Sequence, residues 1–298
     1  MGNKHMSEKI AKMIFTVFAI VAIVAVCSIT VYMIRLGTPA LLEVGVIDLL
    51  FGTEWKPTAA EPAFGIFYVI LTSIFGTVMS LLIGVPIGLL TAVFLAEVGN
   101  KKLVHIVQPA VELLAAVPSV IYGLLGIMIL KPLMYNLELM IYKDAPEHQF
   151  TGGANFLSAI LVLAIMILPT VINISASSIR AVQPSIKSAS LALGATKIQT
   201  IFKVVLPAAK SGIMTAVVLG MGRALGEAMA IAMVAGGAVN LPLPFHSVRF
   251  LTTLIVGEMS YSSGLHREAL FTIGLVLFVF ILFVNIFLTR IVKKGETE

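Results

Sequence analysis

The chain has 298 residues, of which 59% are apolar and 12% are charged, and its mean hydropathy is +1.05. These values exclude an ordinary soluble domain and indicate a protein that lies largely within a membrane. The formal net charge of +5 is not accompanied by a basic patch interleaved with aromatic residues, so nucleic-acid binding is not expected.

Apolar runs of about 20 residues, the length that crosses a bilayer as a helix, recur along the chain. Their periodicity is helical, without the alternation that is typical of membrane β-strands. We therefore expect an all-α integral membrane protein with six transmembrane helices, at Ile14–Ile34, Thr72–Ala96, Val111–Leu130, Phe156–Ile174, Gly212–Ala235 and Ala269–Thr289.

The first span follows a basic N-terminus, as a signal peptide would. Its apolar run is longer than the roughly 7–15 residues of a signal-peptide core, and no small-residue cleavage motif follows it. We interpret it as a retained anchor. Cys27, the only cysteine, lies within it and is expected to be a small packing residue.

Three polar segments are expected on the outer side, at residues 37–63, 131–155 and 236–268. Trp55, the only tryptophan, is expected at the membrane interface. The short apolar piece Phe250–Val256 cannot span a bilayer, so we predict a re-entrant or surface helix near the mouth of a pathway. Solvated or interfacial positions are expected for the histidines, which fall in the tail and the loops: His5, His105, His148, His246 and His266.

The distribution of Lys and Arg predicts the orientation of the chain. With the N-terminus inside, thirteen of these residues fall on cytoplasmic segments and six on the opposite side. Both termini are therefore expected in the cytoplasm, together with the segment between the fourth and fifth spans.

That cytoplasmic segment, Lys187–Lys210, carries four lysines and no acid. Gly194 is suited to a left-handed stop between two helices. Thr196 and Gln199 have the spacing of a capping box, and Pro207 ends the run. The second helix is predicted to be amphipathic. Its apolar face would consist of Ile198, Ile201, Phe202 and Val205, and its polar face of Lys197, Thr200 and Lys203.

Catalytic signatures do not occur in the sequence. There is no G-x-x-x-x-G-K-[ST] phosphate loop, so the chain is not expected to hydrolyse ATP. It also has no G-x-S-x-G elbow, no H-E-x-x-H motif and no cluster of metal-ligating residues. A membrane-embedded enzyme would need several catalytic groups at one depth, and Arg223 and Glu227 are the only candidates.

Arg223 and Glu227 are charges within the fifth span. Arg223 lies about 11 residues into it, roughly 16 Å into a core of about 30 Å, where a charge costs on the order of 2.5–3.5 kcal/mol. The i, i+4 spacing would allow a structural ion pair along one helix face. In the second interpretation, which we favour, Arg223 meets a passing anion and Glu227 tunes or releases it, because intramembrane charges commonly mark substrate routes.

Ser119 and Tyr122 follow Pro118 in the third span and are weaker candidates for lining a pathway. A proline kink beside an ordinary buried tyrosine explains the same residues.

Two G-x-x-x-G pairs predict close helix contacts, one formed by Gly84 and Gly88 and the other by Gly222 and Gly226 beside the two charges.

Lys187–Lys210 resembles the cytoplasmic loop of ABC-importer permeases, which reads E-A-A, three residues, Gly, nine residues, Ile, one residue, Leu-Pro. Gly194 matches the glycine, Val204 takes the isoleucine position and Leu206-Pro207 matches the end. Ala189 matches the first alanine, whereas Ser188 and Ser190 replace the glutamate and the second alanine. The resemblance implies a type I permease fold whose loop, at about residues 180–210, docks on a cytoplasmic ATPase through Ala189, Gly194, Ala195, Thr196, Ile198, Ile201, Phe202, Val205, Leu206 and Pro207.

Three segments, Glu112–Gly123, Ala189–Pro207 and Gly222–Val234, further resemble the phosphate-importer permeases of the PstC and PstA type. The ending GEAMAIAMV and the segment Ala269–Asn285 look more like PstC. The resemblance covers roughly residues 64–290, the permease core, with an additional N-terminal helix and outer loop at 1–63 and a cytoplasmic tail at 291–298. It implies that Arg223 and Glu227 take part in phosphate passage, with Ser119 and Tyr122 as further pathway candidates.

The resemblance also implies the partners. A periplasmic or extracellular phosphate-binding protein would deliver inorganic phosphate, and a PstA-like permease would complete a heterodimer in the lipid of a prokaryotic cell (inner) membrane. A cytoplasmic ATPase dimer would carry ATP and Mg, with no cofactor on this chain, and drive alternating access. The alternatives are a permease for sulfate or molybdate, and a secondary anion transporter or channel whose basic loop lies on the anionic inner leaflet.

Overall fold

The computed structural model describes residues 2–294 of the chain, so residues 295–298 of the predicted cytoplasmic tail lie outside it. Almost all of its regular structure is helical, with three π-helical turns and one short β-hairpin. In chain order the elements are α1 (Gly2–Val44), α2 (Val46–Phe51), β1 (Trp55–Lys56), β2 (Ala63–Phe64), α3 (Phe67–Val93), η1 (Phe94–Val98), α4 (Lys101–Ala116), α5 (Ser119–Leu125), η2 (Gly126–Leu130), α6 (Lys131–Tyr142), α7 (Phe156–Arg180), α8 (Pro184–Ala192), α9 (Lys197–Thr200), η3 (Ile201–Val205), α10 (Leu206–Ala208), α11 (Lys210–Gly226), α12 (Met229–Val234), α13 (Leu251–Glu258) and α14 (Gly264–Lys294).

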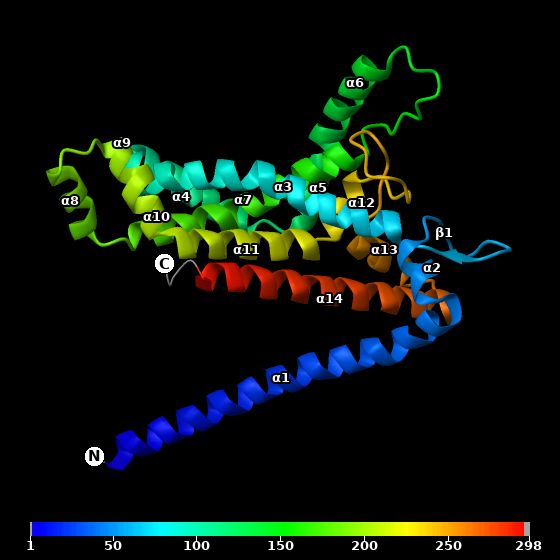
Figure 1. The fold of residues 1–298 in the computed structure, drawn as a ribbon, viewed down its shortest axis with the longest axis horizontal. Helices are drawn as coiled ribbons and strands as arrows, with labels where there is room; N and C mark the ends of the chain where they lie inside the picture. The colour runs from blue at the N-terminus through cyan, green and yellow to red at the C-terminus, as the bar shows by residue number, and fades with distance from the viewer. Residues whose placement is uncertain (1, 295–298) are drawn as a thin grey trace.

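The long helices form a bundle. Figure 1 shows α3, α7, α11 and α14 along one axis, with α8 and α9 at one end and α2 and β1 at the other. Helix α7 is the central member, because most of its apolar window is buried in the chain. Helix α1 begins and α14 ends toward the α8 end, so the two ends of the described chain lie on one side of the molecule.

The predicted all-α membrane fold is confirmed. Five helices of the described residues are long and apolar enough to cross a membrane, and a bent helix pair gives a sixth if it is counted as one span. That pair, 197–208 and 210–226, is bent by 69°. The single helices are Glu8–Val44, Phe67–Val98, Ser119–Tyr142, Phe156–Arg180 and Gly264–Phe287.

The third predicted span, Val111–Leu130, is wrong as one continuous helix. Helix α4 stops, and the backbone is extended at Val117 and Pro118, with ψ angles of 126° and 143°. A proline has no N–H to donate and disfavours helical backbone in the residue before it, which explains the break. The apolar helix then continues to Tyr142, so the predicted outer loop at 131–155 begins as helix.

The fifth predicted span, Gly212–Ala235, is also interrupted. Helix α11 ends at Gly226, the backbone is extended at Glu227 (φ −73°, ψ 130°), and α12 begins at Met229. A glycine weakens a helix interior by about 1 kcal/mol relative to alanine. The interruption therefore falls directly after a residue of low helix propensity, Gly226.

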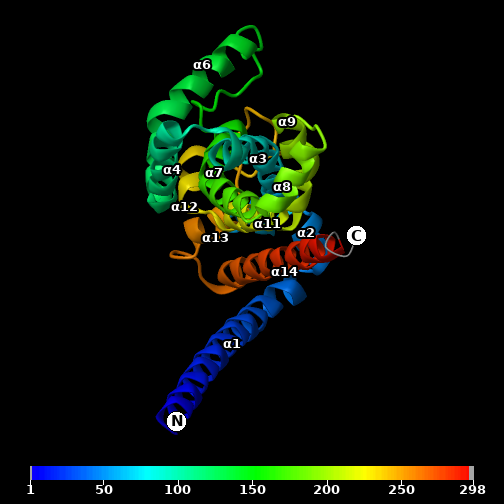
Figure 2. The same cartoon turned by 90° about the vertical axis from the view of Figure 1, so that its left-hand side faces the viewer.

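The first predicted span lies inside a longer helix. Helix α1 continues to residue 44, so the start of the predicted outer loop at 37–63 is helical as well. The hydroxyl of Thr272 donates to the carbonyl of Gly37 at 2.7 Å and joins α1 to α14. From this contact α1 diverges from the bundle (Figure 2). Cys27 is exposed on α1, so its predicted packing role is not fulfilled within this chain.

Three side chains of the predicted outer loops, expected to be solvated or interfacial, are buried or half-buried and are paired with carboxylates. Nε1 of Trp55 donates to Oε2 of Glu258 at 3.0 Å, and Nε2 of His266 lies 2.8 Å from the same oxygen. Nε2 of His148 lies 2.9 Å from Oε1 of the buried Glu138. These pairings were not predicted, because single-residue hydropathy gives no sign of a distant carboxylate partner.

The short apolar piece that was predicted to be re-entrant or superficial forms α13. Leu251 and Leu254 of this helix are fully or almost fully buried, in a cluster with Leu270 of α14. It is therefore an internal support rather than a surface helix.

One glycine pair makes the predicted close contact and the other does not. A methyl group added at Gly84 or Gly88 would lie 2.7–2.8 Å from Ile167 or Val171 of α7. A methyl group added at Gly222 or Gly226 would meet no atom of the described chain within 4 Å. The predicted seam beside Arg223 is therefore not formed within this chain.

We expect Gly88→Ala to lower the stability of the purified chain by about 1–3 kcal/mol, because the new methyl overpacks the stiff side chain of Val171. Gly222→Ala is the matched control, since it adds the same group in open space. Thermal unfolding in detergent measures both, and equal melting temperatures would contradict the packing of α3 on α7.

Candidate functional site

The four predicted pathway residues lie on the two interrupted helices. At the second interruption, Oε1 of Glu227 accepts the N–H of Ala230 at 2.9 Å, so this side chain caps the start of α12. The N–H of Glu227 still bonds to the carbonyl of Ala224 at 3.4 Å. The carboxylate thus replaces a backbone acceptor that a continuous helix would have supplied.

Arg223 lies one turn before this interruption and is half-buried. Its Nη1 donates to Oγ1 of Thr170 on α7, at a long 3.4 Å. The i, i+4 ion pair with Glu227 is not formed, because the helix that would align the two side chains ends between them. A guanidinium has five N–H donors, and the bond to Thr170 uses one of them.

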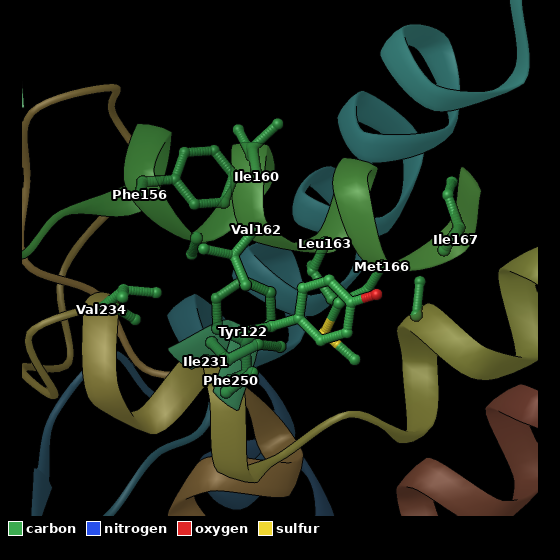
Figure 3. Packing of buried hydrophobic residues seen from close by; sticks show 14 of the residues in the cluster. Tyr122, Phe156, Ile160, Val162, Leu163, Met166, Ile167, Ile231, Val234 and Phe250 are labelled. Carbon is green, nitrogen blue, oxygen red and sulfur yellow. The ribbon is translucent and has the colours of Figure 1, made fainter. Parts of the chain in front are cut away.

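Tyr122 forms a hydrogen bond across the first interruption. It is buried, and its hydroxyl donates to the carbonyl of Leu114 at 2.6 Å, across the break at Pro118. Figure 3 shows Tyr122 with Ile231 of α12 against α7. The ordinary buried tyrosine is therefore the interpretation that the structure confirms, whereas the expected proline kink is a full break.

The two interruptions lie close together. A methyl at Gly123 of α5 would meet the Cα of Ala230 on α12 at 3.0 Å, so these short helices touch. Ser119, half-buried, is the first residue of α5. The structure thus places the four predicted pathway residues around two adjoining helix breaks.

The loop that was predicted to be cytoplasmic has the predicted backbone. Gly194 is left-handed, with φ of 86°, between α8 and α9. Thr196 and Gln199 form both hydrogen bonds of the capping box, at 3.2 Å and 2.9 Å. The helical run ends at Ala208, directly after Pro207, and then bends into α11.

The predicted single apolar face of this loop is wrong. Ile201 and Val205 are buried at 3% and 0% exposure in a cluster of the chain itself, whereas Ile198 and Phe202 are exposed at 70% and 52%. Thr200, predicted on the polar face, is buried and bonds to Ser190 at 3.0 Å. Residues four apart share a helix face, so the four apolar residues form two stripes, one facing the bundle and one facing solvent.

The remaining loop positions follow this division. Leu193, which lies between the two helices of the loop, is a further exposed apolar residue, at 90% exposure. Ala195 and Leu206 are half-buried, and the exposed positions among the predicted docking residues include Ala189, Gly194, Thr196 and Pro207.

The loop is anchored by contacts that the sequence reasoning missed. None of the residues of α8 is buried, yet Lys187 forms an ion pair with Glu97 in the turn after α3. Arg180 donates to the carbonyl of Leu95 at 3.2 Å and to Gln108 at 2.9 Å. These partners are 72–90 residues apart in sequence, and no local pattern relates them.

Comparisons with known proteins give a consistent result. Residues 84–295 match the model of the family described as binding-protein-dependent transport system inner membrane component. The chain is 37% identical to the probable ABC transporter permease protein YqgH of Bacillus subtilis, over 97% of this chain and 93% of that one. It is 34% identical to the phosphate transport system permease protein PstC of Pasteurella multocida, over 78% of this chain and 75% of that one.

The fold also has solved counterparts. A crystal structure of a bacterial alginate ABC transporter, in complex with an alginate pentasaccharide-bound periplasmic protein, contains a chain that matches with a TM-score of 0.63. The match covers 94% of this chain and 96% of that chain at 20% identity. An inward-facing structure of the MetNI methionine ABC transporter matches with a TM-score of 0.53 over 78% of this chain and 94% of that chain, at 21% identity.

Shortening a side chain should have different effects on stability in the two stripes of the loop. We expect Ile201→Ala to destabilise the purified chain by about 2–4 kcal/mol, because it leaves a cavity in the buried cluster. Ile198→Ala should change stability by no more than about 0.5 kcal/mol, as an exposed substitution. Thermal or denaturant unfolding in detergent measures both, and the reverse order would show that the loop is turned the other way.

Proposed function

Because the chain belongs to the binding-protein-dependent transport system inner membrane components, it is the multi-pass permease subunit of an ABC importer, and we propose that its substrate is inorganic phosphate. It is not an enzyme, and ATP hydrolysis belongs to a separate subunit. The fold is that of type I importer permeases.

The half-buried Arg223 is the observation that carries the proposed substrate. A guanidinium presents several donors in a plane and binds phosphate oxygens two at a time. In this chain the hydrogen bond of its side chain to Thr170 is long, at 3.4 Å, and the neighbouring Gly222 and Gly226 have no atom packed against their Cβ positions. The similarity to PstC proteins supports phosphate over other oxyanions.

Glu227 has two tasks in this proposal. One carboxylate oxygen caps α12 and keeps the helix break in place. The negative charge so close to Arg223 also limits how tightly an anion is held, because like charges repel most strongly where water is scarce. Arg223 therefore attracts phosphate, and Glu227 favours its release.

In this proposal the cytoplasmic loop transmits the energy of ATP hydrolysis from the ATPase to the bundle. Ile198 and Phe202 are exposed apolar residues on a capped helical run, and Leu193 is exposed just before it; this surface fits a groove of the ATPase dimer. The ion pair between Lys187 and Glu97 connects α8 to α3, so a pull on the loop reaches the bundle. ATP and Mg bind to the ATPase partner, and its closure and reopening alternate the access of the pathway.

The other partners follow from the two ends of the molecule. The α8 end, where α1 starts and α14 stops, faces the cytoplasm, in agreement with the Lys and Arg distribution. The opposite end, with the β1–β2 hairpin, receives a periplasmic or extracellular phosphate-binding protein. A PstA-like permease forms the second half of the heterodimer in the membrane.

Phe202→Asp tests the docking surface. A charge on this exposed ring should prevent the ATPase groove from closing around the loop, so ATP hydrolysis and phosphate uptake become uncoupled while the chain itself stays folded. Uptake and ATPase activity in proteoliposomes measure this. Leu103→Asp, at another exposed apolar position near the same end, is the control. Normal coupled transport by the Phe202 variant would rule out this surface.

Arg223→Gln tests the substrate site. Losing a charge-assisted contact should reduce the rate of phosphate uptake roughly 100-fold or more, while the complex still assembles. Arg223→Lys should retain part of the rate because it keeps the charge. Radiolabelled phosphate uptake and co-purification of the subunits are the two measurements. If the complex fails to assemble with glutamine, Arg223 has a structural role instead.

A further inference from the structure

Helix α13 is fixed to α3 at its beginning. The N–H of Leu251 donates to the hydroxyl of Ser73 on α3 at 2.9 Å, and both residues are buried. A methyl at Gly76 would lie 2.5 Å from the ring of Phe250, so the chain enters α13 pressed against α3. The start of α13 is therefore in direct contact with α3.

The end of α13 is fixed to the outer face. Glu258 accepts from Nε1 of Trp55 in the hairpin at 3.0 Å and from Nη1 of Arg249 at 2.5 Å. Nε2 of His266 on α14 lies 2.8 Å from the same carboxylate, whose side chain is only 9% exposed. These residues line an outer cavity of about 750 Å³ together with the hairpin turn 56–59.

The first turn of α13 also holds the break beside Arg223. The hydroxyl of Thr252 donates to the carbonyl of Glu227 at 2.6 Å. This carbonyl belongs to the extended residue between α11 and α12, where the regular helical pattern of hydrogen bonds is interrupted. Its partner comes from a different element, so the break cannot shift without moving α13 or losing the bond.

We propose that α13 couples the outer face to the helix break beside Arg223, and that Thr252 is the positioning residue that makes this connection. Helix α13 has eight residues and is about 12 Å long, so it moves as one rigid piece. A partner that docks on the hairpin and changes the contacts at Glu258 thereby displaces the carbonyl of Glu227. The proposal rests on the proposed function in so far as the docking partner is the binding protein.

Thr252→Val removes the hydroxyl and keeps the shape of the side chain. In the complex reconstituted in liposomes, we expect the ratio of ATPase activity with and without phosphate-loaded binding protein to fall at least about fivefold, the size expected for one lost hydrogen bond. Thr252→Ser should restore it. The matched control is Thr77→Val, which removes a buried hydroxyl that bonds within its own helix, to the carbonyl of Ser73. An unchanged ratio in Thr252→Val, or no rescue by serine, would overturn the proposal.

Amide exchange gives a second measurement that needs no substrate. In the assembled complex in nanodiscs, Trp55→Phe removes one donor from the far end of α13 and should raise exchange in the segment 224–232 about fivefold. In the Thr252→Val background the same change should add little, because the connection is already broken. Unchanged exchange in Trp55→Phe, or strictly additive effects, would contradict the coupling.

The two measurements separate the proposals. If phosphate-loaded binding protein does not stimulate the wild-type complex, the proposed substrate is wrong. The exchange measurement then decides the role of α13 by itself.

Discussion

A backbone N–H or C=O group without a partner inside a bilayer costs on the order of several kcal/mol, and this constraint governs the centre of the molecule. Two spans are interrupted there, and polar side chains form hydrogen bonds with backbone groups at these breaks. Tyr122 donates to the carbonyl of Leu114, Glu227 accepts the N–H of Ala230, and Thr252 donates to the carbonyl of Glu227. Arg223, beside the second interruption, makes one long hydrogen bond, to Thr170.

The two ends of the molecule are built differently. The end with α8 and α9 presents an exposed apolar stripe, with Ile198 and Phe202, while the second stripe of the same loop packs on the bundle. The opposite end holds α13 through the carboxylate of Glu258. Arg223 lies between these two ends. The helix break beside it is bonded to α13, and the helix that contains Arg223 follows the loop directly.

Local sequence signals predicted the helical membrane fold, the capping box at Thr196 and the left-handed Gly194, because each depends on residues that are near one another in the chain. They placed continuous helices where Pro118 and Glu227 interrupt them, although a proline was a usable warning at the first site. The pairs of Glu258 with Trp55 and of Lys187 with Glu97 join residues 203 and 90 positions apart. Only the folded chain brings them together, so the sequence offered no local sign of them.

The central claim is that ATP hydrolysis by a partner drives phosphate through this permease. ATP hydrolysis by the complete complex in liposomes, titrated with binding proteins loaded with phosphate, sulfate or molybdate, tests it most directly. Phosphate-loaded binding protein alone should stimulate hydrolysis and produce phosphate accumulation that stops without ATP. Stimulation by a different oxyanion, or phosphate accumulation without the ATPase, would contradict the account.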